Sequence, residues 1–576
     1  MRNSILSTLL LFLGFTFISQ AQSPTISEEI KNNIKARVDY GINTGIVVGI
    51  VTSKGTEYHS YGVKSFETEE KVDENSIFEI GSITKTFTGL LLADAVVKRE
   101  LNLDDPIQNL LPNGINAPTK NGESIKLFHL SNHTSSLARL PGNLTISNPS
   151  NPYGDYSVEQ MYEFLNTYEL PRAIGSQFEY SNYAVGLLGN ILAAKSKSSY
   201  EELMVDIIAK PLGMGNTRIV LTPEMKKNLA FGHSNGVQVE NWDLPTLAGA
   251  GAIRSSALDM AKYLSANMGI VTTNLFPALE LTHKISSGDS IKQKVGLGWI
   301  IEEKNDSKII WHNGATGGYR AFTGFIKNGD YGVIVLTNSA APITDLGMYM
   351  LDSSKTLIQP KPSISLEMRK LLDNKSIKKA TKSYWNISEN EKDQYNFEEN
   401  ELNSLGYFYI QKNEIDKAVA VLALNVQAYP ESFNAYDSYA EALMLNNENK
   451  KAIANYKKSL ELFPGNTNGI EMLKKLGVDT KEFEKEVKIA SATLKSYVGN
   501  YELVPGFILT ITKEGNQLIA QATGQGANPI YPSSENEFYL KVVDAQIVFN
   551  RNEAGEVESL TLFQAGQELV GKKNKD

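Results

Sequence analysis

The sequence predicts an α+β fold in its N-terminal part, followed by a helical part and a small antiparallel β part. Three observations predict this organisation. Strand-like runs such as "GIVVGIVTS" and "YGVIVLTNS" stand near both ends of residues 26–360, with apolar helical stretches between them. A spacing of 34 positions recurs within residues 364–480. Short alternating runs fill residues 490–574.

Length and charge limit what the protein does. The chain has 576 residues, more than one hydrophobic core usually holds, so several domains are expected. Its net charge of -9 argues against a general nucleic-acid binder, which needs clustered Lys and Arg to neutralise phosphates. We therefore expect a small-molecule or peptide substrate and no nucleic acid. The chain has 0 cysteines, so it forms no disulfide.

The first residues read as a secretory signal peptide. Arg2 precedes an apolar run, Leu9–Ile18, that is too short to span a bilayer, and a small residue follows at Ala21. We expect residues 1–21 to be removed by cleavage near Ala21 and the mature protein to be periplasmic or secreted. No later stretch is apolar and long enough to cross a membrane, so no transmembrane segment is expected.

In residues 26–360, strands near both ends suggest that the terminal strands share one sheet, with helices flanking it. The motif "PKPS" at residues 360–363 marks the exit from this part, because two prolines in four residues cannot continue a helix or a sheet ladder.

The helical part, residues 364–480, resembles tetratricopeptide repeats. Such repeats have small residues where paired helices touch, a large apolar residue between them and a proline at the end of the unit. This stack is a candidate platform for a protein partner. The matching pairs, each 34 residues apart, are Ala418 and Ala452, Leu422 and Tyr456, and Pro430 and Pro464.

The last part, residues 490–574, alternates apolar and polar residues in short runs. Glycines in "KEGNQ" and "NEAGE" stand where hairpins would turn, so we expect a small antiparallel β barrel. The motif "YVGNYEL" and this hairpin rhythm resemble the lipocalin-like module found at the C-terminus of exported serine hydrolases.

The motif "GSITKTFTG" places Ser82 and Lys85 three residues apart at the start of an apolar helix. Residues i and i+3 share one helix face, so hydroxyl and amine can come within hydrogen-bond reach. Burial of that helix would lower the pKa of Lys85 and let it accept a proton. A second Ser-x-x-Lys, Ser376 to Lys379, lies in the polar stretch "DNKSIKKATK" and has no comparable context.

Two further motifs accompany this pair. In "EYSNYAVGLLG", Tyr180 and Asn182 are two apart, a spacing that points both side chains into one cavity, or alternatively marks a helix-capping turn. In "WHNGATGGYRAF", His312 precedes Gly314 and Ala315 on what reads as an edge strand. Gly314 would admit a substrate backbone and the N–H of Ala315 would stabilise an oxyanion; the alternative is a plain hairpin.

In this order, Ser-x-x-Lys, Tyr-x-Asn and His-x-Gly resemble the serine β-lactamase and penicillin-binding-protein superfamily. The likeness covers about residues 30–350 and includes "HLSNHTSSL" and "LAGAGAIRSSALDMAKYL". It is nearest to the class C β-lactamase-related branch, which includes D-Ala-D-Ala carboxypeptidases, D-amino-acid peptidases and esterases. The resemblance implies a β-lactamase-like antiparallel sheet flanked by helices.

The resemblance also implies roles. Ser82 would be the acylated nucleophile, Lys85 its proton partner, and Tyr180 the general base. Asn182 would hold a substrate amide, and the N–H groups of Ser82 and Ala315 would form the oxyanion hole. His312 replaces the lysine of the usual Lys-Thr-Gly, and a histidine is charged only part of the time near neutral pH.

Peptide or ester hydrolysis is therefore expected ahead of β-lactam hydrolysis. A non-catalytic penicillin-binding or repeat-mediated interaction protein is the alternative from another class. No cofactor and no metal are expected, because His129 and His133 lack further ligands nearby and belong to a structural turn in the family. His59, His233 and His283 are expected at the surface or in loops.

Overall fold

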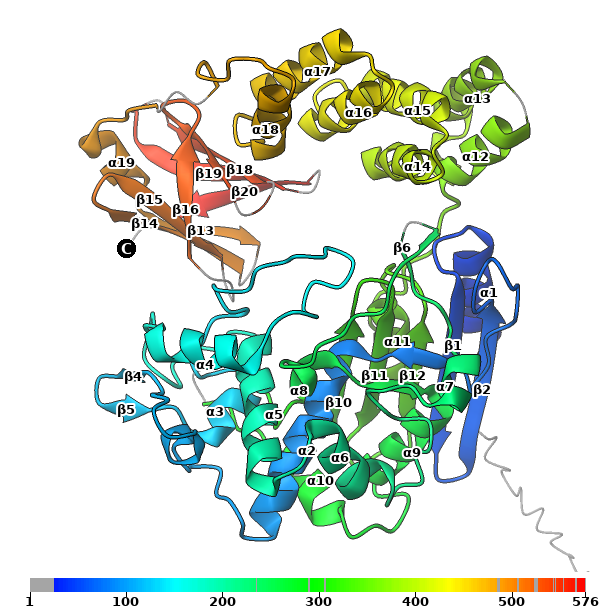
Figure 1. The fold of residues 1–576 in the computed structure, drawn as a ribbon, viewed down its shortest axis with the longest axis vertical. Coiled ribbons are helices and arrows are strands. Elements are labelled where there is room, and N and C mark those ends of the chain that lie inside the picture. The colour runs from blue at the N-terminus through cyan, green and yellow to red at the C-terminus, as the bar shows by residue number, and fades with distance from the viewer. Residues whose placement is uncertain are drawn as a thin grey trace, which may run out of the picture.

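A computed structural model describes residues 25–574, except 235, 289–290, 305–306, 375, 484–486, 505–506, 523–526, 542, 544, 553 and 565–566 (Figure 1). The predicted signal peptide, residues 1–21, lies outside the described residues. Among the residues described, no helix combines the length and the apolar character that crossing a bilayer requires.

The N-terminal part is built on a six-stranded sheet in the order β2-β1-β12-β11-β10-β9. Each neighbouring pair is antiparallel, and β1 pairs with β12 so that Ile46 faces Thr337. The prediction that the terminal strands share one sheet is therefore confirmed. The strands are β1 (Gly45–Thr52), β2 (Gly55–Gly62), β9 (Ile300–Lys304), β10 (Ser307–Ala315), β11 (Arg320–Ile326) and β12 (Gly332–Thr337).

Both faces of this sheet are covered by helices. Every residue of β1 is buried, with Ile46, Val48 and Ile50 in one core and Val47 and Val51 in the other. This alternation follows from the period of two along a strand and explains why the run "GIVVGIVT" is continuously apolar. The first core holds α1 (Glu28–Asp39) and α11 (Thr344–Leu351), and the second holds α2 (Thr84–Val97), α9 (Ala257–Asn267) and α10 (Phe276–Thr282).

Helix α2 lies inside the larger core, and its residues from Thr84 to Asp94 are all buried. It follows a short strand and a 3-10 turn, so the chain enters the helix directly at residues 81–83. The other elements of the N-terminal part are β3 (Ile77–Glu79), η1 (Gly81–Ile83), η2 (Ile107–Leu110), β4 (Thr119–Lys120), β5 (Glu123–Ser124), α3 (Leu127–Ser131), α4 (Val158–Thr167), α5 (Asn182–Ser196), α6 (Tyr200–Met204), η3 (Val205–Ala209), α7 (Pro223–Lys227), β6 (His233–Ser234), β7 (Val237–Gln238), α8 (Ala248–Gly251) and β8 (Arg254–Ser256).

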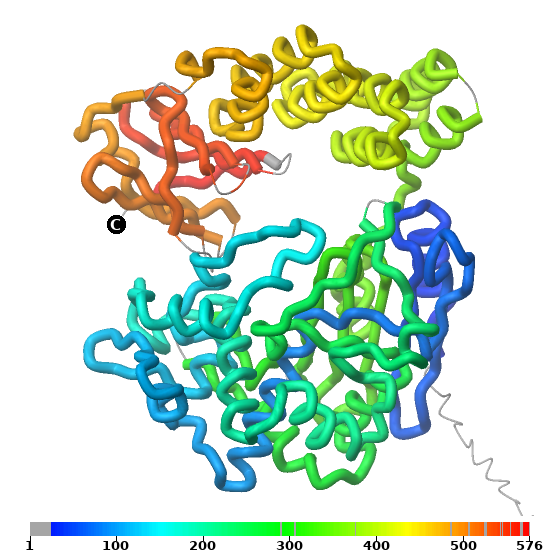
Figure 2. The backbone as a smooth tube through the Cα atoms, in the orientation of Figure 1, coloured from blue at the N-terminus to red at the C-terminus, as the bar shows by residue number. Residues whose placement is uncertain are grey.

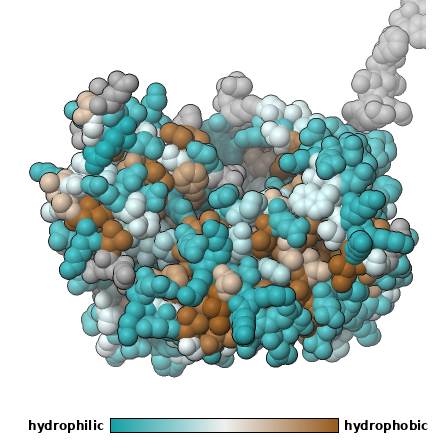
Figure 3. Space-filling model, turned by 90° about the horizontal axis from the view of Figure 1, so that it is seen from above, coloured by the Kyte–Doolittle hydropathy of each residue, from teal (hydrophilic) through white to brown (hydrophobic). Residues whose placement is uncertain are grey.

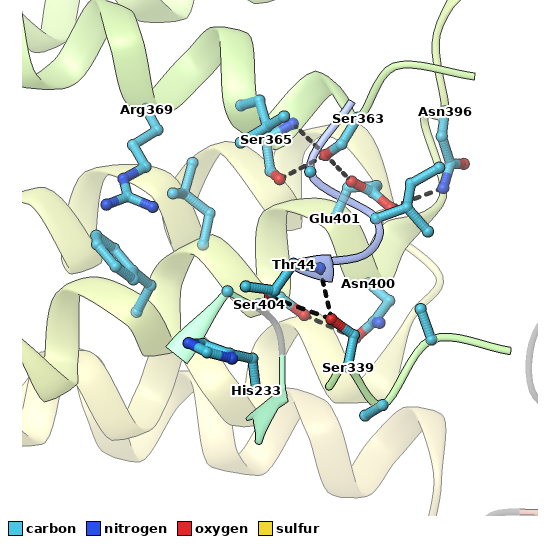
Figure 4. A pocket seen from close by; sticks show the side chains of 18 residues that line it. Thr44, His233, Ser339, Ser363, Ser365, Arg369, Asn396, Asn400, Glu401 and Ser404 are labelled. Atoms are coloured by element: carbon cyan, nitrogen blue, oxygen red, sulfur yellow. Dashed lines mark hydrogen bonds between the residues drawn. The ribbon is translucent and has the colours of Figure 1, made fainter. Parts of the chain in front are cut away.

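The connection out of the N-terminal part is fixed by hydrogen bonds beside a cavity of about 320 Å³ (Figure 4). Ser363 donates to the carboxylate of Glu401, and Asn396 Nδ2 donates to the same group at 2.7 Å. The backbone N–H of Asn396 also bonds the carbonyl of Pro362 at 2.9 Å. Burial raises the pKa of Glu401, and these two donors counteract that shift.

The helical part consists of antiparallel pairs (Figure 2). Its second and third pairs repeat after 34 residues, since Glu399 and Phe433 open their first helices and Ile415 and Asn449 their second. The repeat positions Leu422 and Tyr456 are fully buried, as predicted. Assignment to the tetratricopeptide family stays a prediction. The helices are α12 (Ile364–Asn374), α13 (Ile377–Asn390), η4 (Lys392–Gln394), α14 (Glu399–Gln411), α15 (Ile415–Ala428), α16 (Phe433–Leu445), α17 (Asn449–Leu462) and α18 (Thr467–Lys475).

The last part is a closed antiparallel barrel, which confirms the predicted β barrel. Gly515 and Gly555 have φ of 57° and 79° in the predicted hairpin turns, a backbone that favours glycine. Apolar and aromatic side chains, among them Tyr501 and Phe549, fill its core. The elements are α19 (Ser491–Tyr497), β13 (Gly499–Val504), β14 (Phe507–Glu514), β15 (Gln517–Ala522), β16 (Asn528–Pro532), β17 (Glu537–Leu540), β18 (Ala545–Arg551), β19 (Val557–Gln564) and β20 (Gln567–Lys573).

The barrel and the helical part lie together on one side of the N-terminal part (Figure 1). Gln546 donates to the carbonyl of Leu462 at 3.3 Å, and Tyr539 packs edge-on against Phe463 with ring centroids 5.7 Å apart. The face seen in Figure 3 is largely hydrophilic, with hydrophobic residues scattered in small groups. The boundaries of the three parts, residues 26–360, 364–480 and 490–574, stay a prediction.

Candidate active site

Ser82 and Lys85 meet at the start of α2. Lys85 Nζ lies 3.0 Å from Ser82 Oγ and donates to the carbonyl of Ala250 at 2.7 Å. Ser82 is partly exposed, whereas Lys85 is 0% exposed. A reachable hydroxyl is therefore bonded to an amine that water does not reach. The second Ser-x-x-Lys motif differs from this one: Ser376 and Lys379, at the start of α13, are both exposed.

Burial controls the charge of Lys85. It lowers the pKa of the amine well below 10.5, and the positive charge of Arg139 lowers it further. No carboxylate forms an ion pair with Lys85 in the described part of the chain. The amine of Lys85 therefore loses its proton, and becomes able to accept one, at a lower pH than the amine of an ordinary lysine.

Tyr180 completes a compact group with this pair. Lys85 Nζ lies 4.8 Å from the centroid of the Tyr180 ring, and a hydrogen bond to Ser82 lowers the pKa of the phenol. Burial dominates over that bond and over the charge of Arg139, so the pKa of Tyr180 is raised to about 12. The phenol is therefore protonated near neutral pH, where Lys85 is the stronger candidate for the base.

Asn182 and Ala315 line one small cavity with Ser82, of about 40 Å³. Asn182 is the first residue of α5, and the helix cap is Ser181, whose hydroxyl accepts the N–H of Ala184 at 2.9 Å. Asn182 is thus free of the capping role that was its alternative interpretation. Asn182 reaches the cavity from α5 and Ala315 from β10.

His312 belongs to β10 and is buried. Its Nδ1 lies 2.5 Å from the carbonyl of Asn313, an arrangement that needs the proton on Nδ1. Burial and then the charge of Lys85 lower the pKa of His312 to about 3, against the effect of that hydrogen bond. The sequence suggested a histidine that is charged part of the time; in the folded protein it is neutral near pH 7.

Gly314 packs against the main chain of Ile80 and Ser82, where a substrate had been expected. A Cβ at Gly314 would lie 2.0 Å from the carbonyl oxygen of Ile80 and 3.2 Å from the N of Ser82. The glycine therefore lets β10 approach the turn that carries the nucleophile, whereas the sequence suggested that it admits a substrate. Strand β10 is also not an edge strand, because β9 pairs with it up to Trp311; residues 312–315 continue past that pairing.

Two residues near Tyr180 were not anticipated as neighbours of the site. The ring of His133 lies 4.4 Å from that of Tyr180, and its Nδ1 accepts the N–H of Ser181 at 3.1 Å. The guanidinium of Arg139 lies 5.1 Å from the centre of the same ring. His133 was visible in "HLSNHTSSL" as a turn residue, but nothing local in the sequence marks Arg139.

An aromatic wall beside the cavity is held by a buried ion pair. Trp242 and Tyr153 line the cavity with ring centroids 5.3 Å apart. Glu79 Oε1 accepts the N–H of Trp242 at 3.0 Å, and Arg254 donates both to Glu79 at 3.2 Å and to the carbonyl of Trp242 at 2.8 Å. The pair thus fixes the main chain on both sides of the Trp242 side chain.

Two of the remaining histidines differ from expectation. His233 and His283 were expected at the surface or in loops, but both are buried. His283 bonds Asn267 at 2.9 Å, and burial lowers its pKa to about 4. Polar partners inside the core explain the burial, and such partners cannot be read from single letters. His59 is partly exposed on β2.

Comparison with known protein families identifies the family of the N-terminal part. A family model described as Beta-lactamase matches residues 30–348. The chain belongs to the β-lactamase family. This confirms the resemblance inferred from the three motifs, all of which fall within the matched residues. A second model, described as a domain of unknown function (DUF3471), matches residues 484–573 of this β-lactamase-family protein.

Curated relatives include two from Escherichia coli (strain K12). A "Beta-lactamase" is 27% identical over 321 residues, covering 50% of this chain and 81% of the relative. The "D-alanyl-D-alanine-carboxypeptidase/endopeptidase AmpH" is 27% identical over 363 residues, covering 60% of this chain and 92% of the relative. Both relatives support an enzyme, and their names divide between β-lactamase and peptidase.

A solved structure supports the fold. The β-lactamase/D-alanine carboxypeptidase from Pseudomonas syringae superposes with a TM-score of 0.50 at 20% identity, covering 57% of this chain and 98% of its own. The β-lactamase-like fold of the N-terminal part is thereby confirmed.

Gly314→Ala should damage both the fold and the site. Because the added Cβ meets the carbonyl of Ile80, β10 must move away from the nucleophile turn. We expect a loss of about 1–3 kcal/mol in the free energy of unfolding and a roughly 100-fold slower acylation of Ser82. Urea unfolding and the rate of phosphonate labelling measure the two effects. Gly215→Ala is the control, since open space surrounds that position; equal effects of both variants would contradict the explanation.

Lys85→Met should stabilise the protein while abolishing acylation. Between the lowered pKa of Lys85 and 10.5 the unfolded chain binds a proton that the folded chain does not, so stability rises with pH in that window. At pH 7 the variant should gain about 0.5–2 kcal/mol, and the gain should shrink as pH approaches 10.5. Unfolding measured across pH tests this. Lys195→Met, at an exposed position, should show no such gain.

Glu79→Ala should destabilise the protein and loosen Trp242. Removing one partner leaves the guanidinium of Arg254 buried, at an expected cost of about 3–5 kcal/mol. Urea unfolding gives the cost, and acrylamide quenching of tryptophan fluorescence reports the loosening. Asp243→Asn is the matched control, because the side chain of this other partner of Arg254 is 65% exposed. A comparable loss in the control would show that Glu79 has no special part.

Proposed function

We propose that this protein is an exported serine hydrolase that acts through an acyl-enzyme on an amide or ester. One observation supports this above all: the buried amine of Lys85 is hydrogen-bonded to Ser82 in a cavity that Asn182 and Ala315 also line. Such an arrangement activates a hydroxyl that is otherwise a weak nucleophile. Family membership supports the same class of reaction.

In the proposed acylation, Ser82 Oγ bonds to the substrate carbonyl carbon while its proton passes to the neutral amine of Lys85. The protonated phenol of Tyr180, bonded to Ser82, then passes a proton to the leaving amine or alcohol and is reprotonated from Lys85. This division gives Lys85 the role of base and Tyr180 the role of proton donor. The sequence had suggested Tyr180 as the base.

The developing oxyanion is stabilised by main-chain N–H groups of Ser82 and Ala315. Strand β10 brings Ala315 to this position, because Gly81 and Gly314 leave room for close packing between strand and turn. Asn182 supports the substrate from the α5 side of the cavity. Water then attacks the ester carbonyl and gives its proton to the amine of Lys85. The phenol of Tyr180 passes a proton to Ser82 Oγ as the acyl bond breaks, and Tyr180 is reprotonated from Lys85.

Peptide or ester hydrolysis ranks ahead of β-lactam hydrolysis. The supporting observation is the neutral, buried His312: at this position on β10 the protein lacks the permanent charge that suits the carboxylate of a β-lactam. The relative named as a carboxypeptidase/endopeptidase fits this ranking, and the one named as a β-lactamase keeps the second candidate open.

The proposal extends to the rest of the chain. Cleavage of the leader near Ala21 would deliver a periplasmic or secreted enzyme, and the helical part would bind a protein partner. The paired helices with their recurring 34-residue spacing support a partner platform.

Ser82→Ala should abolish turnover and labelling by an active-site-directed phosphonate, because no other hydroxyl among the described residues is bonded to Lys85. Intact-protein mass spectrometry measures the label. Ser376→Ala is the matched control, since it removes the serine of the other Ser-x-x-Lys and should leave labelling unchanged. Labelling that persists in Ser82→Ala would reject the nucleophile.

Turnover should be seen on p-nitrophenyl esters or D-amino-acid amides at higher kcat/KM than on a chromogenic cephalosporin. A protein that takes up one equivalent of probe and turns over none of the three would instead favour the non-catalytic penicillin-binding alternative.

A further inference from the structure

Arg139 lies beside Tyr180 on a well-fixed backbone. Its carbonyl accepts the N–H groups of Asn182 at 3.0 Å and Tyr183 at 3.2 Å, at the start of α5. The hydroxyl of Ser181 donates to the neighbouring carbonyl of Ala138 at 2.6 Å. The exposed side chain reaches back over the ring of Tyr180, 5.1 Å from its centre.

The guanidinium has no acidic partner among the described residues. In the described part of the chain, the guanidinium contacts the face of the Tyr180 ring, which is itself in contact with Lys85. An arginine at a surface is normally either solvated or paired with a carboxylate. Here it is aimed at the proposed reacting groups, and its charge acts on Lys85, His133 and Tyr180.

The other positively charged side chains near the site are buried or already hydrogen-bonded within the protein, so they are less available to a ligand than Arg139. Lys85 is buried and bonded to Ser82 and Ala250. Arg254 is buried in its pair with Glu79. Arg320 donates to the carbonyls of Thr316 and Tyr319, both at 2.8 Å. The positive charge that a substrate would meet first is therefore that of Arg139.

We propose that Arg139 binds an anionic group of the substrate, a carboxylate, on the α5 side of Ser82. The inference rests on the proposed hydrolase function and adds a substrate class to it. A planar guanidinium binds a carboxylate through two parallel hydrogen bonds, so the residue would both attract and orient the substrate. Strand β10 carries the neutral His312, so recognition of the carboxylate would lie with Arg139 and not with the residue on β10.

The test uses matched ester pairs that differ only in charge. p-Nitrophenyl hemiglutarate is compared with its neutral methyl ester, and 4-acetoxybenzoate with its methyl ester, so the carboxylate lies in the acyl group or in the leaving group. The readout is the ratio of kcat/KM for the charged ester to that for the neutral one. Any effect of Arg139 that acts only through Tyr180 cancels in this ratio.

In Arg139→Gln the ratio should fall about 10- to 100-fold for at least one pair, the range for losing a hydrogen bond to a charged group. Arg139→Lys should restore part of the ratio, since lysine keeps the positive charge but cannot form two parallel hydrogen bonds with a carboxylate. In the parent the ratio should also fall with added salt. Arg99→Gln, at an exposed position at the far end of α2, should leave both ratios unchanged.

A second measurement tests the proposal without turnover, and so applies even if the esters are hydrolysed too slowly to measure. Glutarate should slow phosphonate labelling of Ser82 more than glutaramide does, and Arg139→Gln should remove that difference. Ratios and protection that are the same in Arg139→Gln and the parent overturn the anion site while leaving the hydrolase intact. Absence of any label on Ser82 in the parent overturns the hydrolase, and the substrate class falls with it.

Discussion

The burial of one lysine amine is the constraint on which the site depends. Lys85 extends from a helix whose first eleven residues are all buried, so its charged form has no water and no carboxylate to stabilise it. The carbonyl of Ala250 and the hydroxyl of Ser82 are the polar partners left to it. A group that would be a solvated cation on a surface thereby becomes a base in contact with a nucleophile.

The same burial orders the groups around it. Desolvation keeps the phenol of Tyr180 protonated and the imidazole of His312 neutral. The site thus holds an amine of lowered pKa 4.8 Å from the centre of the Tyr180 ring, and that ring lies 6.3 Å from the imidazole of His312. Arg139 is an exposed permanent charge beside Tyr180, whereas Arg254 is buried in its pair with Glu79.

The aromatic wall links this chemistry to the scaffold. Trp242 comes from a loop, and loops are ordinarily the most variable geometry in a fold. Here the buried Glu79 bonds its N–H, and Arg254 bonds its carbonyl. Because Glu79 lies on β3, two residues before η1, one short segment supports both the nucleophile and the wall opposite it. Movement of the wall is therefore coupled to the strand that leads into the nucleophile.

The sequence by itself determined what depends on neighbouring residues: Ser82 and Lys85 on one helix turn, glycines at the barrel hairpins, and the 34-residue helix spacing. Helical periodicity and the backbone freedom of glycine are local properties, so they can be predicted from the amino-acid sequence. Only the tertiary structure decided that Arg139 faces Tyr180, that Gly314 packs on Ile80, and that His233 and His283 are buried. These depend on segments far apart in the chain, because burial and charge state are set by everything that surrounds a group and not by its neighbours in sequence.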